Sequence, residues 1–203
     1  MRLILWKPYS EQQARWPKSG KQILAQFDHE SIVVYQAYRP EIAAFAVEQQ
    51  KFGGEFWRDR MTWIKPGFLW MMYRSGWATK SEQERILAIW LRRSDFELFL
   101  SEAVASTYHA SNLRSRELWQ EAVKHSDVRL QWDPDHGPSG GKLERRALQL
   151  GLRDKALRRY ETSAILEIQD ITVQVREQAE KSLSELQTPR EDIYPWATET
   201  EEE

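Results

Sequence analysis

The sequence contains no cysteine among its 203 residues. This absence excludes disulfides, thiolate catalysis and zinc sites with thiolate ligands, and it fits a reducing interior. No apolar run approaches the ~20 residues that a membrane-spanning helix needs. The first ten residues, "MRLILWKPYS", place a single basic residue before an apolar stretch that is too short for a signal peptide. We therefore expect a soluble, cytoplasmic protein without a membrane partner.

Repeats, low-complexity linkers and a phosphate loop of P-loop spacing are also missing. We predict a single globular domain over residues 1–188 and an acidic, flexible tail over residues 189–203. Hairpin-like strands near the N-terminus and the lack of a glycine-rich phosphate loop favour an α+β fold over a doubly wound parallel fold. The expected architecture is a mixed, mainly antiparallel sheet of about seven strands with flanking helices.

Hydrophobic periodicity and turn residues predict where the strands and helices lie. Strands are expected within residues 2–8, 22–28, 31–38, 60–64, 84–93, 127–133, 144–152 and 164–171. Helices are expected within residues 39–50, 66–76, 94–105, 115–125, 154–161 and 173–187. The second and third strands are expected to form a hairpin, and Thr172 is expected to cap the last helix. Residues 84–93 also fit a helix, but a helical start directly after them favours a strand.

The charges are unevenly distributed along the chain. Residues 161–203 carry 12 acidic and 3 basic side chains, a balance of −9, whereas residues 1–160 carry 19 acidic and 26 basic side chains, a balance of +7. A basic body suggests an anionic partner, either a small anionic molecule or a nucleic acid. The alternative is that an acidic C-terminal region merely keeps a mildly basic domain in solution.

The stretch "RDRMTWIKPGFLWMMYRSGW", residues 58–77, combines tryptophans with basic side chains. Its helical part is apolar on nearly every side, which predicts a buried helix with Trp70, Met71 and Met72 in the core.

The basic residues of this stretch need either acidic partners or a bound anion, because unpaired charges are costly to bury. We predict that Arg60, Lys65 and Arg74 bind a ligand, although Asp59 is an alternative partner for an arginine. Lys65 comes directly before a helix N-terminus, where free N–H groups favour an anion.

A second informative stretch, "QWDPDHGPSGGKLERR", places Asp133, Asp135 and His136 within four residues after a strand. Three interpretations remain open. These residues can stabilise a turn, they can transfer a proton with His136 as acid or base, or they can hold a metal ion. The spacing matches no tight metal motif, so we predict no metal and take Asp133 and His136 as candidate catalytic residues.

The strand that follows alternates between two faces. Arg145 and Gln149 share a polar face, which we predict to bind a ligand, whereas Leu148 and Leu150 lie on the core face. Glu167 lies in the middle of a later strand and is a third candidate catalytic residue. Arg145, Gln149 and Glu167 would converge if these two strands were neighbours.

Four segments resemble the bacterial and fungal family known as domain of unknown function 4291: "IVVYQAYRPEIA", "RMTWIKPGFLWMMYRSGW", "VRLQWDPDHGPSGGKLERRALQLGL" and "EIQDIT". The resemblance spans roughly residues 20–180. It implies one intact domain and carries no activity with it.

Two function classes follow from these features. The first is an enzyme that acts on a nucleotide or nucleic acid, for which ADP-ribosyl transfer offers an analogy. Tyr38 and Arg39 would bind a nucleotide such as NAD, and Glu167 would stabilise the oxocarbenium-like centre. The sequence lacks the histidine-tyrosine-glutamate and arginine-serine-glutamate patterns of such enzymes. The alternative is a non-catalytic RNA- or DNA-binding module with a basic, aromatic face; a structural interaction protein is a third option.

Overall fold

The computed structural model describes residues 1–196. Its strands are β1 (Trp6–Pro8), β2 (Leu24–Ala25), β3 (Ser31–Tyr38), β4 (Thr62–Ile64), β5 (Arg85–Arg92), β6 (Ala103–Ala105), β7 (Val128–His136), β8 (Lys142–Leu152), β9 (Ile165–Asp170), β10 (Gln187–Pro189) and β11 (Asp192–Ile193). Its helices are α1 (Tyr9–Gln13), α2 (Pro40–Gln49), α3 (Phe68–Ser75), α4 (Arg93–Ser101), α5 (Arg116–His125), α6 (Asp154–Arg159) and α7 (Thr172–Ala179), with short turns η1 (Tyr108–Ala110) and η2 (Tyr160–Ala164). The α+β class and the single domain are confirmed.

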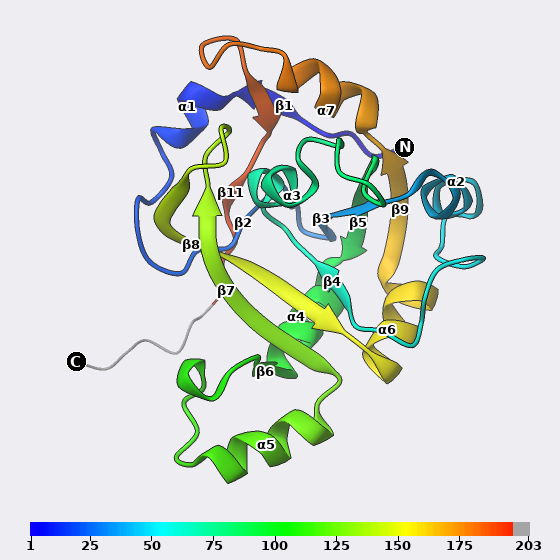
Figure 1. The fold of residues 1–203 in the computed structure, drawn as a ribbon, viewed down its shortest axis with the longest axis vertical. Coiled ribbons are helices and arrows are strands. Elements are labelled where there is room, and N and C mark those ends of the chain that lie inside the picture. Colours follow the sequence, from blue (N-terminus) through cyan, green and yellow to red (C-terminus); the bar gives the residue numbers. More distant parts are fainter. Residues whose placement is uncertain (197–203) are drawn as a thin grey trace.

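Two sheets form the frame of the molecule (Figure 1). One has the strand order β3-β5-β9 and is antiparallel throughout, and the other has the order β4-β8-β7-β6, in which only β6 and β7 are parallel. A backbone hydrogen bond of 2.7 Å from the Tyr35 N–H to the Lys65 carbonyl joins β3 to the residue after β4. Seven strands thus lie in a mainly antiparallel arrangement, but it is split into two sheets at this bridge.

Alternation along β3 divides the core into two clusters. Ile32 and Val34 pack into a cluster that also contains the apolar face of β8, while Val33 and Tyr35 pack into a cluster around α3. Every residue of "SIVVYQAY" except Ala37 is buried, as expected of a strand that is covered on both faces. This explains why β3 is a nearly continuous apolar run.

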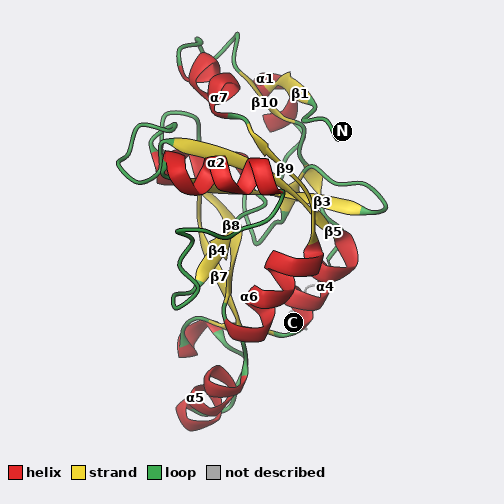
Figure 2. Ribbon diagram, turned by 90° about the vertical axis from the view of Figure 1, so that its right-hand side faces the viewer, coloured by secondary structure: helices red, strands yellow, loops and turns green. Residues whose placement is uncertain are grey.

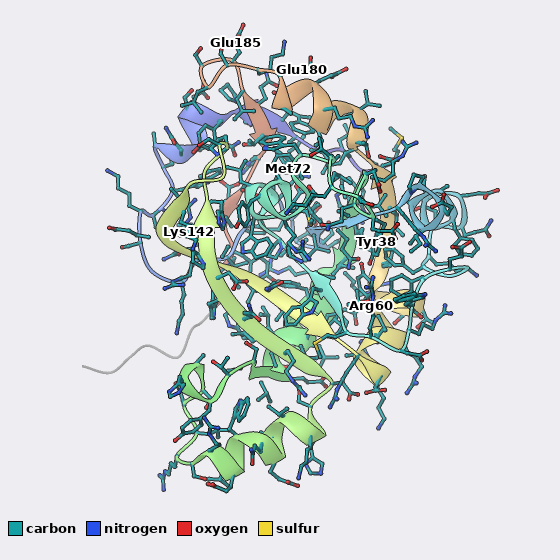
Figure 3. The ribbon with its side chains drawn as sticks, in the orientation of Figure 1. Tyr38, Arg60, Met72, Lys142, Glu180 and Glu185 are labelled. Atoms are coloured by element: carbon teal, nitrogen blue, oxygen red, sulfur yellow. The ribbon has the colours of Figure 1, made fainter. Side chains whose placement is uncertain are left out.

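Helix α3 is buried, as its composition predicts. Trp70, Met71 and Met72 are all below 8% exposed, with values of 7%, 2% and 0%. Gly76 ends the helix at a φ of +58°, a left-handed conformation that glycine adopts without strain. Met72, in the upper half of the view in Figure 3, belongs to the buried cluster that also contains Val33 and Tyr35 of β3.

Several boundaries differ from the sequence expectations. The expected hairpin is present but short: Phe27 and Ile32 form an antiparallel bridge, and the Asp28 and Val33 N–H groups donate to the Ser31 and Gln26 carbonyls, both at 2.9 Å, whereas strand β2 itself pairs with β11. The fourth helix ends at Ser101 because the chain turns into the short strand β6.

The start of α7 also differs from the expectation. Thr172 lies inside the helix rather than at its cap, and its hydroxyl accepts a hydrogen bond from the Ile86 N–H. The helix ends at Ala179 rather than at residue 187.

Part of the segment that the charges assign to a tail belongs to the fold. Residues 189–196 include the end of β10 and all of β11, and Glu191 and Tyr194 are 3% and 2% exposed. The remainder of the expected tail, residues 197–203, lies outside the described residues.

Helix α5 projects from one end of the molecule, and both views place it away from the main body (Figures 1 and 2). None of its residues is buried. Over residues 1–196, no helix has the length and apolar character that crossing a membrane requires.

Candidate functional site

A cleft of about 850 Å³ opens where β3, β4 and α3 meet. Its lining contains six of the seven residues predicted to bind a ligand: Tyr38, Arg39, Arg60, Lys65, Arg74 and Gln149. Tyr38 and Arg60 lie close together on the same side of the molecule (Figure 3). The end of β3, the segment 60–74 and strand β8 therefore bring these side chains to one place.

The register of the sheet builds the floor of this cleft. Ile64 pairs with Leu150, so the next residue, Lys65, continues the same register toward Gln149. Gln149 in turn pairs with Gln131 of β7. Side chains directly opposite each other on neighbouring strands point to the same face of a sheet. Lys65, Gln149 and Gln131 thus form a polar row across three strands.

Lys65 is buried but has no anionic partner in the described part of the chain. It is 6% exposed, and its ammonium group lies 5.2 Å from the centre of the Trp70 ring. Its Nζ forms no hydrogen bond or ion pair with any of residues 1–196. Burial, reinforced by the positive charge of Arg74, lowers the pKa of Lys65 to about 7 even though Asp133 favours the charged form.

Asp133 holds the two glutamines of the row in place. Its Oδ1 accepts a hydrogen bond of 2.8 Å from Nε2 of Gln131, and its Oδ2 accepts one of 2.6 Å from Nε2 of Gln149. Asp133 is two residues from Gln131 on the same strand, so all three side chains lie on one face. This predicted catalytic residue therefore contacts the cleft floor through the glutamines.

Aromatic side chains form the walls of the cleft. Trp63 lies across Gly151, because a Cβ added to that glycine would be 3.1 Å from Cε2 of Trp63 and 2.3 Å from Sδ of Met61. At the mouth, Trp57 is 66% exposed, and the guanidinium of Arg60 lies 5.1 Å from the centre of its ring. The cleft thus offers both a partly buried indole and an exposed one.

The three arginines of the cleft differ in their charge partners. Arg39 forms ion pairs with Glu41, Glu55 and Glu82, so its charge is already compensated. Arg60 and Arg74 form no ion pair with any residue between 1 and 196. They are therefore the arginines whose charge is available to an anionic ligand.

Arg145 lies on the predicted strand face but outside this cleft. It forms a buried ion pair with Asp135 at 2.7 Å, donates to the Pro17 carbonyl at 2.8 Å, and stacks 5.4 Å from the centre of the Trp16 ring. The neighbouring void measures only about 10 Å³. This pairing gives Asp135 a structural role, as in the first of the three interpretations of Asp133, Asp135 and His136.

His136 is enclosed between aromatic rings. It is 3% exposed and stacks on Tyr73, with ring centres 3.6 Å apart and an angle of 9° between the planes. Neither of its ring nitrogens has a hydrogen-bond partner among the described residues. Burial lowers the pKa of His136, which favours the neutral ring. Its side chain does not line the cleft.

Glu167 lies far from the cleft residues Tyr38 and Arg39. It pairs with Trp90 of β5, which pairs with Val33, five residues along β3 from Tyr38. Because five is an odd number of residues, Tyr38 lies on the face of the sheet opposite to that of Val33, Trp90 and Glu167. The carboxylate of Glu167 accepts hydrogen bonds from the backbone N–H of Arg2 and the side chain of Gln169. Because β9 pairs with β5 rather than β8, Glu167 does not converge with Arg145 and Gln149.

Comparison with protein families matches residues 22–196 to a domain of unknown function, DUF4291. The chain belongs to this family. The matched span includes both principal sheets and the whole cleft, so the resemblance seen in the four sequence segments is confirmed. A search of curated proteins found no match.

The polar row of this DUF4291 chain contains one residue that sequence reasoning missed, Gln131. Gln131 lies two residues before Asp133 on the strand predicted at 127–133, so the sequence indicates that the two share a face. Its pairing with Gln149 is not indicated, because the pattern does not state which strands are neighbours. Trp63 was likewise recognised only as part of a tryptophan-rich stretch.

The acidic and histidine side chains of the 133–136 segment point to different partners. Asp133 binds the two glutamines and Asp135 binds Arg145, as described above. In the part of the chain that the structure describes, no three acidic or histidine side chains are grouped in a way that would hold a metal ion.

Proposed function

We propose that this chain is an enzyme that acts on a nucleotide or nucleic acid, and that Lys65 takes part in the reaction as a neutral amine. The observation that carries the proposal is a buried lysine without an anionic partner among residues 1–196, at the floor of a large cleft. An ammonium group in such surroundings is costly, and proteins seldom bury one without compensation. Strongly shifted groups in clefts are typical of catalytic residues.

A pKa of about 7 keeps much of Lys65 unprotonated at neutral pH. The free electron pair of the amine can accept a proton from a substrate hydroxyl, or it can attack an electrophilic carbon or phosphorus atom. Both reactions are compatible with a nucleotide-dependent transferase.

The lining supports a nucleotide as the ligand. Arg60 and Arg74 supply positive charge for phosphate groups, and Trp57 and Trp63 supply flat surfaces on which a base can stack. The volume of about 850 Å³ falls in the range of small-molecule and cofactor sites. NAD and other nucleotides are therefore the first ligands to test.

ADP-ribosyl transfer needs a carboxylate beside the nucleotide, and Glu167 lies on the opposite sheet face from Tyr38. The proposal therefore rests on Lys65 and does not include a role for Glu167.

A non-catalytic RNA- or DNA-binding module is the second candidate. It is favoured by the exposure of Trp57 beside Arg60 at the mouth of the cleft. Such a module would bind single strands with little base preference and would not need Lys65 to lose its proton.

A thermal-shift screen of mononucleotides, NAD and short single-stranded oligonucleotides tests the proposal. A ligand that binds only the folded protein should raise its melting temperature. Arg60→Gln should reduce that rise, whereas the matched exposed control Arg15→Gln should leave it unchanged. The proposal fails if no ligand of this set gives a rise in the full chain.

Turnover separates the two candidates. With a ligand from the screen, Lys65→Met should still show a thermal shift but should no longer convert the ligand. Mass spectrometry of the parent protein would show whether an adduct forms on Lys65. Binding that is equal in both proteins, with no conversion by either, would favour the binding module.

A further inference from the structure

The amide groups of Gln131 and Gln149 have a fixed orientation. A carboxylate oxygen only accepts hydrogen bonds, so the amide nitrogen of each glutamine must point toward Asp133. The contacts of 2.8 Å and 2.6 Å satisfy both oxygens of Asp133 at once. The carbonyl oxygen of each amide is therefore turned away from Asp133.

These two carbonyl oxygens have no hydrogen-bond partner in the described part of the chain. Neither Oε1 of Gln131 nor Oε1 of Gln149 accepts a hydrogen bond from any residue between 1 and 196. Both side chains line the cleft, and they are direct neighbours in the β7–β8 register. The floor of the cleft therefore presents two adjacent acceptors to whatever enters it.

A flat surface lies next to these acceptors. Trp63 pairs with Gly151, which is two residues from Gln149 on the same strand face. Because glycine has no side chain there, the indole ring can approach the backbone of β8 closely. A base stacked on Trp63 would have its edge directed at the neighbouring row.

We propose that Gln131 and Gln149 recognise a nucleobase that carries an exocyclic amino group. This inference rests on the proposed function and specifies the substrate class of the same cleft. The amino group of adenine, cytosine or guanine donates to a carbonyl oxygen. Hypoxanthine and uracil carry an oxygen at the position where adenine and cytosine carry the amino group, so their oxygen would face the glutamine oxygens with no hydrogen between them.

Asp133 acts as a positioning residue in this scheme. Without it, each glutamine could rotate its amide and present its N–H₂ group instead, so the site would accept oxo and amino bases alike. This gives Asp133 a role that differs from proton transfer.

The experiment compares two pairs of ligands that differ at this one group. The affinities of the full chain for AMP and IMP, and for CMP and UMP, are measured by calorimetry at one pH and one salt concentration. We expect the amino member of at least one pair to bind about tenfold more tightly, since a specific base contact gives discrimination of that order. The ratio within a pair cancels contributions from the phosphate and from the charge of Lys65.

Variants identify the source of the preference. Gln131→Leu and Asp133→Asn should each bring the ratio close to one, whereas Gln83→Leu, at another part of the cleft lining, should leave it unchanged. Asp133→Asn keeps a hydrogen-bonding group but lets the glutamines rotate. If that variant does not fold, Gln131→Leu decides the question.

The outcomes distinguish the two proposals. Equal affinity for both members of each pair overturns the base recognition and leaves the nucleotide-binding proposal in place. A preference that persists in Gln131→Leu also overturns it. Failure of all four nucleotides to bind overturns the base recognition, and the proposed function is then decided by NAD and the oligonucleotides in the thermal-shift screen.

Discussion

Lys65 and Arg145 are alike in burial and opposite in their surroundings. Each is 6% exposed, each lies against a tryptophan ring at 5.2 Å or 5.4 Å from its centre, and both lie on the same face of the four-stranded sheet. Arg145 has an aspartate and a backbone carbonyl as partners and lies beside a void of about 10 Å³. Lys65 has neither partner within residues 1–196 and lies in a cleft of about 850 Å³.

The difference separates structural from functional burial of a charge. A buried cation whose donors are all satisfied holds segments together, and here Arg145 connects the start of β8 to the N-terminal segment at Pro17. A buried cation without such partners is destabilising, so its retention needs another explanation. Binding or chemistry in the adjacent cleft supplies one for Lys65.

The largest expected effect comes from breaking the satisfied pair. Arg145→Ala should lower the free energy of unfolding by about 3–5 kcal/mol, because the buried carboxylate of Asp135 would lose its cationic partner. Urea denaturation measures this change. Replacing the partner residue, Asp135→Ala, should lower the free energy of unfolding by a similar amount. The loss in the double variant should be smaller than the sum of the two single losses. Additive losses would contradict the structural role of the pair.

Lys65→Met should raise the free energy of unfolding, whereas Arg145→Ala lowers it. The folded protein holds the proton of Lys65 less tightly than the unfolded chain does, because burial lowers the pKa to about 7 from the ordinary value of 10.5. The cost of the charge is therefore fully present below about pH 7 and is lost as the pH rises toward 10.5. Removing the amine should stabilise the protein by about 2–4 kcal/mol at pH 6.

The pH dependence provides the control for this prediction. The increase in the free energy of unfolding caused by Lys65→Met is measured by urea denaturation at pH 6 and again above pH 9. It should be smaller at the higher pH. An increase that is the same at both values would mean that the methionine packs better for reasons unrelated to charge. A destabilised variant at pH 6 would show that the ammonium group has a partner in solution.

The sequence could indicate the face that carries both cations but not the difference between them. Alternation in "RRALQLGL" correctly separates Arg145 and Gln149 from the core-facing leucines. What encloses Arg145 is Trp16 and Pro17, about 130 residues earlier, and no local pattern encodes such a contact. For the same reason the sequence could not predict the Lys65–Gln149–Gln131 row, which depends on the order of the strands in the sheet.

Other elements followed from local signals. The buried helix α3 was predictable because its apolar residues leave no polar face, and Gly76 marks its end. Glu167 illustrates the limit, since its strand was predicted almost to the residue and its neighbour was not. Strand β9 pairs with β5, so the condition for convergence of Glu167 with Gln149, that their strands are neighbours, is not met.

A smaller effect is expected where the cleft wall meets β8. Gly151→Ala places a Cβ 2.3 Å from Sδ of Met61 and 3.1 Å from Cε2 of Trp63, so both side chains must move. Overpacking of this kind typically costs about 1–3 kcal/mol. Nucleotide affinity should fall further than in an Ala147→Gly control on the same strand face. Unchanged affinity, measured by calorimetry, would exclude Trp63 as a stacking surface.

The smallest effect concerns the influence of Arg74 on Lys65. The positive charge of Arg74 is the second cause that lowers the pKa of Lys65, after burial. Removing it makes protonation of the amine easier, so Arg74→Gln should move the titration of Lys65 to higher pH. Arg74 is exposed, and water and salt screen its charge, so the change should be less than one pH unit.

NMR of lysine labelled with ¹³C at the ε carbon follows this titration directly, and Lys65→Met identifies the resonance. Arg15→Gln, which removes another exposed arginine that does not line the cleft, should leave the midpoint unchanged. Because charge repulsion weakens with ionic strength, the difference between Arg74→Gln and the parent should narrow as salt is added. A midpoint that stays near the ordinary lysine value in the parent protein would remove the contrast with Arg145, since Lys65 would then be a solvated cation and not a buried amine.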